Sequence, residues 1–264
     1  MNGPLELGWM QLAGAAALLL LNAGLSVALR LGLERTIAVA AVRAAAQLAL
    51  LGLVLESIFG WDRWEPVAGW CFLMIVLAAR AGVRRSKRRY TGIDSVGFVA
   101  LAVAGGSTAW LATTVLIGVE PWWAPRYLIP LLGMILGNAL TGISLGLDRC
   151  LQELDEGAER VDLALALGAT RSEAARPVAA EALRAGMIPI LNSMTVVGLV
   201  TIPGMMTGQL LGGVDPGTAA RYQLLILFLI AAATAAGTGL AVFGSLRALF
   251  DDQHRLRRER ISLR

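Results

Sequence analysis

Long apolar segments alternate with short charged segments along this chain of 264 residues. An α-helix needs about 20 predominantly apolar residues to cross the hydrocarbon core of a membrane. Seven segments approach that requirement, at residues 7–29, 36–59, 66–81, 95–119, 127–147, 187–201 and 218–246. The third is short, and the sixth runs into a stretch rich in glycine. The pattern therefore predicts an all-α integral membrane protein with seven transmembrane helices.

The charges between these segments predict their orientation, because cytoplasmic loops carry an excess of Lys and Arg. RLGLERT, RAGVRRSKRRYTG and the C-terminal DDQHRLRRERISLR are basic, whereas GWDRWEP, GVEPWWAPR and GGVDPGTAAR are close to neutral. Basic and non-basic loops alternate, apart from a long loop of mixed charge at residues 148–186. We expect the N-terminus outside, the C-terminus in the cytoplasm, and an outer belt formed by the tryptophans at positions 61, 64, 122 and 123.

Composition supports a membrane protein. Hydrophobic residues make up 56% of the chain and charged residues 16%, where soluble domains have about a quarter charged residues. The mean hydropathy is +0.66. The net charge of +4 fits basic cytoplasmic loops, so we expect no nucleic-acid partner. We expect one transmembrane permease domain over residues 1–264, in the plasma or inner membrane, with a basic tail at 251–264.

Two further features limit the candidate chemistry. The segment MNGPLELGW lacks the basic region of a cleavable signal peptide, so none is expected. Cys71 and Cys150 are too far apart in sequence and setting to suggest a disulfide, and His254 sits in the charged tail.

The loop at residues 148–186 predicts a cytoplasmic helical hairpin before the sixth span. Gly168 can take the left-handed conformation that ends a helix. Thr170 and Glu173 form a capping-box pattern that starts another, and Pro177 is expected to end or kink this second, short helix. Apolar residues spaced by threes and fours form one face of the first helix: Leu147, Leu151, Leu154, Ala158, Val161 and Leu165. An alternative is an interfacial amphipathic hairpin without a partner.

Four motifs carry a family resemblance: LGNALTGISLGLDR, ALGATRSEAARPV, VTIPGMMTGQLLGG and RYQLLILFLI, in this order. Together they resemble the FetB-like family of ABC-transporter permeases, which includes bacterial permeases assigned to iron export and plant half-transporters linked to aluminium tolerance. The resemblance implies a permease with seven spans that works as a homodimer with a separate cytosolic ABC ATPase subunit.

The segment AERVDLALALGATRSEAARPV also resembles the coupling segment of ABC-transporter permeases, in which a glutamate precedes a glycine. Glu159 and Gly168 match, although Arg160 and Val161 stand where that segment usually has two alanines. The resemblance implies that the ATPase is contacted by Glu159, Leu165, Gly168, Ala169, Thr170 and Glu173.

The sequence contains no G-x-x-x-x-G-K-[ST] run, whose backbone amides and lysine would hold nucleotide phosphates. We therefore expect that this chain binds no cofactor and is not an enzyme. ATP and Mg are expected on the partner subunit.

Polar or irregular positions within the spans are the candidates for a transport pathway or gate. Ionisable and polar groups inside a membrane usually face the bundle interior. The candidates are Arg43, Gln47, Glu56, Asn138, Asn192, Pro203, Gly204, Met205, Met206, Thr207, Gly208, Gln209 and Gln223.

Each candidate also has a structural reading. Arg43 and Gln47 share one helix face, but Arg43 can snorkel to the interface. Asparagines commonly form interhelical hydrogen bonds, and paired methionines such as Met205 and Met206 commonly pack. The sequence has no His/Cys cluster, so a transition-metal site of nitrogen and thiolate ligands is unsupported. Only the family resemblance suggests iron as the substrate.

The stretch TIPGMMTGQLLGG, at 201–213, combines a proline with four glycines at the outer end of the sixth span. Irregular backbone at membrane depth is tolerated where it is buried in protein or lines a cavity. We expect a re-entrant or unwound outer gate here, the alternative being an ordinary extracellular turn.

Other functional classes stay open. Broken helices are typical of ion- or proton-coupled secondary transporters, although no clear proton-relay carboxylate or inverted repeat is evident here. A non-transporting membrane scaffold for a cytosolic ATPase is a further alternative. The substrate and the direction of transport cannot be read from the sequence.

Overall fold

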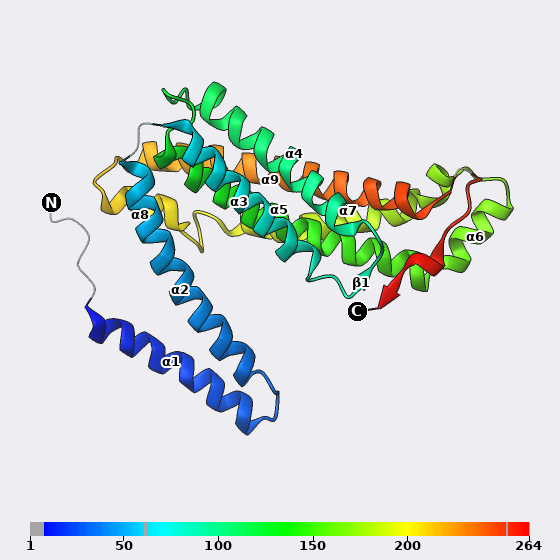
Figure 1. Ribbon diagram of the computed structural model, residues 1–264, viewed down its shortest axis with the longest axis horizontal. Coiled ribbons are helices and arrows are strands. Elements are labelled where there is room, and N and C mark those ends of the chain that lie inside the picture. Colours follow the sequence, from blue (N-terminus) through cyan, green and yellow to red (C-terminus); the bar gives the residue numbers. More distant parts are fainter. Residues whose placement is uncertain (1–7, 61–62, 252, 264) are drawn as a thin grey trace. The chain divides into compact units, whose positions relative to one another are not determined.

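The computed structural model describes residues 8–60, 63–251 and 253–263. These residues form two compact units, one comprising residues 8–60 and 208–214, the other residues 63–207, 215–251 and 253–263. Apart from one pair of two-residue strands, the described regular structure is helical (Figure 1). The expectation of a single domain over the whole chain stays a prediction.

Six described helical segments are long and apolar enough to cross a membrane. They are α1 (Trp9–Ala28), α2 (Glu34–Phe59), α3 (Trp64–Val83), α4 (Ile93–Leu111) with its π-helical extension η1 (Ala112–Leu116), α5 (Pro125–Glu156) and α9 (Pro216–Leu249). The remaining elements are β1 (Arg88–Arg89), α6 (Ala158–Ala166), α7 (Arg171–Val196), α8 (Gly204–Leu211), the 3-10 turn η2 (Arg258–Arg260) and β2 (Ser262–Leu263). The chain is thus a helical multi-pass membrane protein, as the apolar pattern predicts.

The first unit is built on the α1–α2 pair. Ser26 joins the two helices at their connection: its hydroxyl donates to Glu34 Oε2 over 3.1 Å and accepts the backbone N–H of Leu33 over 2.9 Å. Most other side chains of both helices are exposed, and many of them are large and apolar. Large apolar side chains are favourably placed in contact with lipid, whereas their exposure to water is unfavourable.

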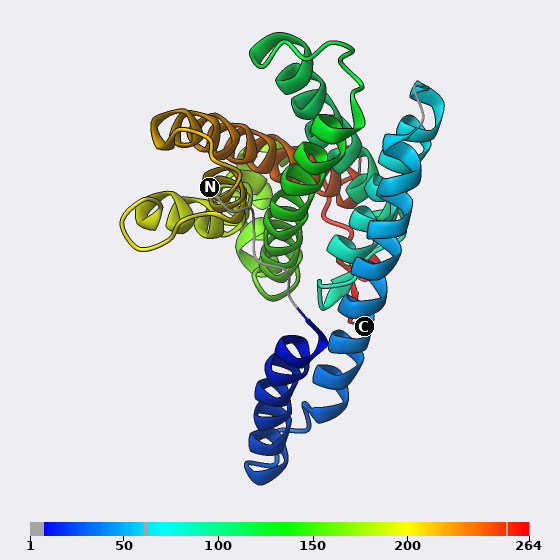
Figure 2. The same ribbon diagram turned by 90° about the vertical axis from the view of Figure 1, so that its left-hand side faces the viewer.

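The second unit is organised around α5, which packs against α3, α4, α7 and α9 (Figure 1). Figure 2 shows α5 with α7 and α9 on one side and α3 on the other. Its inward face is fully buried over several turns, at Ile135, Ala139, Ile143, Leu147 and Leu151.

Helices α5, α7 and α9 approach one another closely at two glycines. A Cβ atom added to Gly142 on α5 would lie 2.9 Å from the carbonyl oxygen of Gly186 on α7, and one added to Gly186 would lie 2.7 Å from the carbonyl oxygen of Gly142. Thr238 of α9 packs against both glycines: its Oγ1 would lie 3.0 Å from the Cβ atom added to either of them. Small residues allow this contact between backbones, the arrangement favoured between helices in membranes.

Two local expectations are wrong in their boundaries. The first helix of the 148–186 loop is not continuous: α5 extends to Glu156, and α6 begins after Gly157. Pro177 does not end a short helix either, because α7 continues through it and through Pro189 to Val196. A proline in a helix removes one hydrogen bond. Here the burial of flanking residues, including Ala174, Ala175, Val178 and Ala179, supports the helix across Pro177.

Gly142 provides a direct test of the α5–α7–α9 contact. In Gly142→Val, the added atoms would meet backbone of α7 and the buried Thr238, which cannot move away without separating the helices. We expect a loss of folded protein or a thermal midpoint lowered by several degrees, measured by thermal unfolding of the purified chain in detergent. Gly137→Val, on the same helix, is the matched control because its Cβ would meet nothing within 4 Å. Equal stability of the two variants would contradict the assigned contact.

Candidate functional site

The predicted coupling segment is a helix, a tight turn and the start of a long helix. Gly168 lies in the turn between α6 and α7 with φ +93°, the left-handed conformation expected of it. The capping box is also confirmed: Glu173 N–H donates to Thr170 Oγ1, and Thr170 N–H donates to Glu173 Oε2 over 2.8 Å. The bonds from the Thr170 N–H and hydroxyl lower the pKa of Glu173, because both donate to its ionised carboxylate.

The surface of this segment carries exposed apolar side chains among charged ones. Of the residues matched to the coupling segment, Glu159, Gly168, Thr170 and Glu173 are exposed, whereas Leu165 and Ala169 are partly buried. Leu163 and Leu167, which the sequence did not single out, are 62% and 80% exposed. Exposed apolar groups rimmed by charge are typical of a surface that binds another protein.

The opposite side of the segment is held to α5. Most of the predicted apolar face is buried: Leu147, Leu151 and Leu154 are fully inaccessible, Ala158 and Val161 are each 3% exposed, and Leu165 is partly buried. At the corner between α5 and α6, Glu153 accepts from Arg149 over 2.8 Å and from Arg160 over 2.7 Å. The segment therefore presents a fixed surface.

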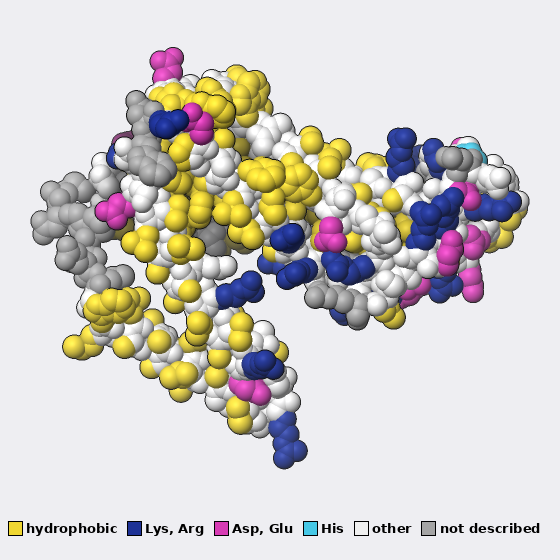
Figure 3. Space-filling view, in the orientation of Figure 1, with side chains coloured by type: hydrophobic (Ala, Val, Ile, Leu, Met, Phe, Trp, Pro, Cys, Tyr) yellow, Lys and Arg dark blue, Asp and Glu magenta, His cyan; other side chains and the backbone are white. Residues whose placement is uncertain are grey.

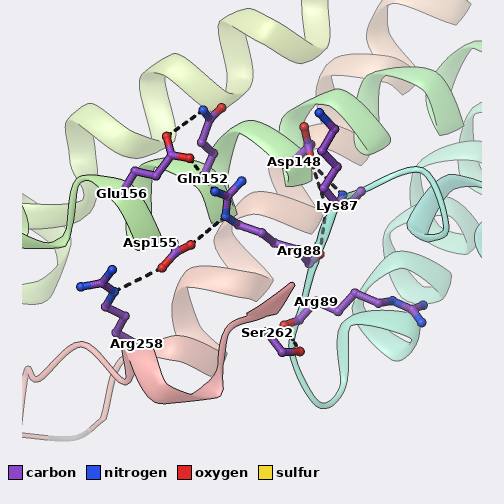
Figure 4. Close-up of polar contacts among 10 residues, drawn as sticks. Lys87, Arg88, Arg89, Asp148, Gln152, Asp155, Glu156, Arg258 and Ser262 are labelled. Carbon is purple, nitrogen blue, oxygen red and sulfur yellow. Dashed lines mark hydrogen bonds and ion pairs between the residues drawn. The ribbon is translucent and has the colours of Figure 1, made fainter. Parts of the chain in front are cut away.

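A buried arginine connects the basic loop after α3 to the end of α5 (Figure 4). Arg88, whose side chain is 11% exposed, donates to Asp155 over 2.9 Å and to Glu156 over 2.6 Å. The bond to Asp155, followed by that to Glu156, raises the pKa of Arg88 against the effect of its burial. Next to it, Asp148 accepts the backbone N–H of Lys87 over 2.9 Å.

The C-terminal tail joins the same cluster. Strand β2 pairs antiparallel with β1, aligning Ser262 with Arg89, and Arg258 donates to the second oxygen of Asp155 over 3.2 Å. His254 Nδ1 accepts the N–H of Arg171, the first residue of α7, over 3.1 Å. Figure 3 shows charged side chains gathered over this end of the second unit, around α6 and the tail.

A second candidate site is a pocket of about 290 Å³ between α5, α7 and α9, closed on one side by the start of α8. It brings together Asn138, Pro203, Gly204, Met205 and Gln223 from the predicted pathway set. Ser193, Thr201 and Met134 line it as well. Asn138 does not bond to a neighbouring helix as its type suggests: its Nδ2 donates to the carbonyl of Met134 one turn earlier, over 2.9 Å.

The stretch at 201–213 is partly unwound and partly helical. Helix α7 ends at Val196, and the chain turns through Gly198 at φ +83°. The N–H of Gly198 donates to the carbonyl of Thr201 over 2.9 Å, and α8 begins at Gly204. Asp215 then caps α9 by accepting the N–H of Thr218 over 2.9 Å. The break after α7 and the first residues of α8 thus lie beside the pocket.

The other predicted pathway residues do not line this pocket. Asn192 is exposed on α7, and Met206 and Thr207 lie on α8 outside the lining. The remaining candidates belong to the first unit: Arg43, Gln47, Glu56, Gly208 and Gln209.

No group of three or more His, Cys, Asp or Glu side chains that could hold a metal ion occurs among the residues that the structure describes. The only cysteines in the sequence, Cys71 and Cys150, carry free thiols.

Two features of the site were missed at the sequence level. One is the packing of Thr238 against Gly142 and Gly186, which the spacing of Gly142 and Gly146 on α5 could have indicated as a small-xxx-small motif. The other is the Arg88–Asp155–Arg258 cluster, for which no short-range signal exists because its members are far apart in the chain.

These observations define the class of the protein: a helical multi-pass membrane protein with a polar, structured segment at one end of its packed unit and a pocket among its apolar helices. Comparison with known proteins gives the family. The profile described as "Uncharacterised protein family (UPF0014)" matches residues 9–250, and the chain belongs to this family.

Relatives extend over nearly the whole chain. The "UPF0014 membrane protein slr1647" of Synechocystis is 35% identical over 252 residues, which cover 94% of each chain. The "Probable iron export permease protein FetB" of Escherichia coli is 32% identical over 228 residues and 86% of each chain. "Protein ALUMINUM SENSITIVE 3" of Arabidopsis thaliana is 31% identical, over 86% of this chain and 82% of its own. These relatives confirm the family resemblance. No solved structure matches the chain.

The Arg88 cluster can be tested by removing the charge alone. Arg88→Met keeps the apolar stem but removes the bonds to Asp155 and Glu156, which retain only Arg258 and Gln152 as partners. The loss of these charged hydrogen bonds should cost about 1 kcal/mol. We expect a lower thermal midpoint for the purified chain. Lys87→Met is the control, because the interaction of Lys87 with Asp148 is made through its backbone N–H. A midpoint for Arg88→Met equal to that of Lys87→Met would show that the cluster does not stabilise the fold.

Proposed function

We propose that this chain is the transmembrane permease subunit of an ABC transporter that exports a metal ion such as iron or a related small solute. ATP hydrolysis on a separate cytosolic subunit drives it. The name of the Escherichia coli relative supports a permease role, and the family match extends over most of the chain. The lipid bilayer, the ATPase and a second copy of this chain are the proposed partners, and ATP and Mg bind the ATPase.

The observation that carries this proposal is the continuity of α7. Its 26 residues run without interruption for about 39 Å, at about 1.5 Å per residue, from the capping box to the edge of the pocket. At its first turn it adjoins the exposed surface with Leu163, Leu167 and Gly168, and Ser193 in its last turn lines the pocket. A movement imposed at the turn therefore has a direct mechanical route to the pocket.

The proposed topology has seven spans: the six long apolar segments together with the C-terminal part of α7, with the N-terminus outside and the C-terminus cytoplasmic. The gathering of the basic loop, the coupling segment and the tail at one end of the second unit supports this orientation. So does an apolar pocket of about 270 Å³ lined by Trp64, Trp122 and Trp123, residues expected at the outer interface. Trp61 lies outside the described residues.

In this arrangement the ATPase binds the turn between α6 and α7. Leu163 and Leu167 supply apolar contact, and Glu159 supplies a polar contact beside them. The break at residues 197–203 with α8 acts as the outer gate. Pro203, Gly204 and Met205 form its pocket side, and Met206, Thr207, Gly208 and Gln209 complete the short helix.

The Gly168 turn tests the coupling. A Cβ at Gly168 would meet nothing within 4 Å, so a substitution there changes the backbone preference and not the packing. At φ +93°, a β-branched residue is strongly strained, whereas Asn tolerates left-handed backbone better. In the chain reconstituted with its ATPase, we expect ATP-driven transport to fall in the order wild type, Gly168→Asn, Gly168→Val. Membrane insertion should be retained, and the strain of one residue, about 1–2 kcal/mol, should lower the thermal midpoint of the permease only modestly.

Transport by Gly168→Val at the wild-type rate would contradict the coupling role of the turn. Failure of the wild-type chain to associate with any ATPase subunit would contradict the proposed class of transporter.

A further inference from the structure

The pocket between α5, α7 and α9 contains a buried amide with an unused acceptor. Gln223 on α9 is 8% exposed and lines this pocket, and its Oε1 has no hydrogen-bond partner. A buried polar atom without a partner costs about 1–3 kcal/mol. Such an atom beside a cavity is well placed to accept a hydrogen bond from a bound solute.

The neighbouring polar groups also present acceptors to the pocket. Asn138 uses its Nδ2 to donate to the carbonyl of Met134, which leaves its Oδ1 as the free end of the amide. Ser193 donates its hydroxyl hydrogen to the carbonyl of Pro189 over 3.0 Å, so its oxygen can only accept. A solute that satisfies these groups must therefore carry N–H or O–H donors.

None of the side chains lining the pocket in the described part of the chain is ionisable. Besides the hydroxyl of Thr201, the rest of its wall is mainly aliphatic or thioether, including Met134, Met205, Ile190 and Ile226. An ion transferred into such surroundings loses its hydration and gains no counter-charge. Tight sites for hard and borderline metal ions include charged carboxylate or thiolate ligands, or imidazole. The pocket offers only neutral amide and hydroxyl oxygens, which do not compensate the charge of an ion.

From this chemistry we propose that the pocket binds an uncharged solute bearing hydrogen-bond donors, and that iron enters it only as a neutral chelate. The proposal rests on the proposed function and deepens it, because it excludes the hydrated cation as the transported form. The volume of about 290 Å³ is at the lower end for ligand pockets and fits a small complex.

Every probe in the test contains iron, and the probes differ in their net charge and in whether they carry N–H donors. Binding of radioactive iron to the purified full chain in lipid nanodiscs is measured with four probes. Ferric tris(acetohydroxamate) is neutral and carries N–H groups, and ferric tris(N-methylacetohydroxamate) is neutral without them. Ferric tris(catecholate) carries three negative charges, and the fourth probe is ferrous ion under anaerobic reducing conditions.

Two variants of one residue identify the site. Gln223→Leu removes the acceptor without removing any hydrogen bond within the protein, so the fold should be retained, as its thermal midpoint will report. Gln223→Glu keeps the shape and adds a carboxylate. Gln11→Leu, an exposed glutamine of α1, is the matched control.

We expect the neutral N–H complex to bind the wild-type chain and the Gln11→Leu control alike. Binding of the neutral N–H complex should be about five- to tenfold weaker in Gln223→Leu than in the wild-type chain. The wild-type chain should bind the N-methyl complex more weakly than the N–H complex by the same factor. The trianionic complex and ferrous ion should show no binding that depends on Gln223, whereas Gln223→Glu should gain affinity for ferrous ion.

Binding of ferrous ion or of the trianionic complex to the wild-type chain that is lost in Gln223→Leu would overturn the proposal. So would the absence of any Gln223-dependent binding of the neutral N–H complex. If the Gly168 series still shows coupling to the ATPase, these results refute only the substrate class, and the transporter assignment stands.

Discussion

The second unit depends on the approach of α5 to α7 at Gly142 and Gly186, with Thr238 of α9 between them. Within a membrane the hydrophobic effect does not drive helices together, so close packing and satisfied backbone groups must hold them. Each glycine faces the other's carbonyl oxygen at a distance that no Cβ could occupy. This contact lies roughly midway along α7, between its coupling end and its pocket end. It fixes the helix against α5 and α9 at the point about which the helix would move.

The same helix joins two regions of opposite character. At one end, Arg88, Asp155 and Arg258 draw the basic loop, the end of α5 and the C-terminal tail into one ion-pair cluster, and His254 bonds the first N–H of α7. At the other end, the pocket is lined by two amides, two hydroxyls, thioethers and aliphatic side chains, none of them charged. This separation suits a protein whose energy source is a cytosolic partner and whose cargo crosses an apolar layer.

The sequence predicted those parts of the structure that depend on local physics. Apolar segment lengths predicted seven spans, and six long apolar helices occur in the described part of the chain. The Gly168 turn and the Thr170–Glu173 capping box followed from the conformational preferences of a few residues. The prediction that Pro177 ends a short helix is wrong, since packing of the flanking residues supports the helix through this proline. The sequence did not predict that Arg88 pairs with Asp155 or that Gln223 and Asn138 line one pocket. Local residue spacing carries no information on contacts between segments far apart in the chain.

The central claim is that α7 moves as a rigid body and carries motion from the coupling turn to the pocket. It is tested most directly by distances between spin labels in the complex reconstituted with its ATPase, using a chain in which Cys71 and Cys150 are replaced by alanine. Labels at Ser172 and Val196, which are exposed and about 36 Å apart along the helix, report on its rigidity. Labels at Val196 and the exposed Leu224 of α9 report on its movement. We predict that ATP changes the second distance and leaves the first unchanged. A second distance unaffected by ATP during active transport, or a first distance that changes with ATP, would contradict the account.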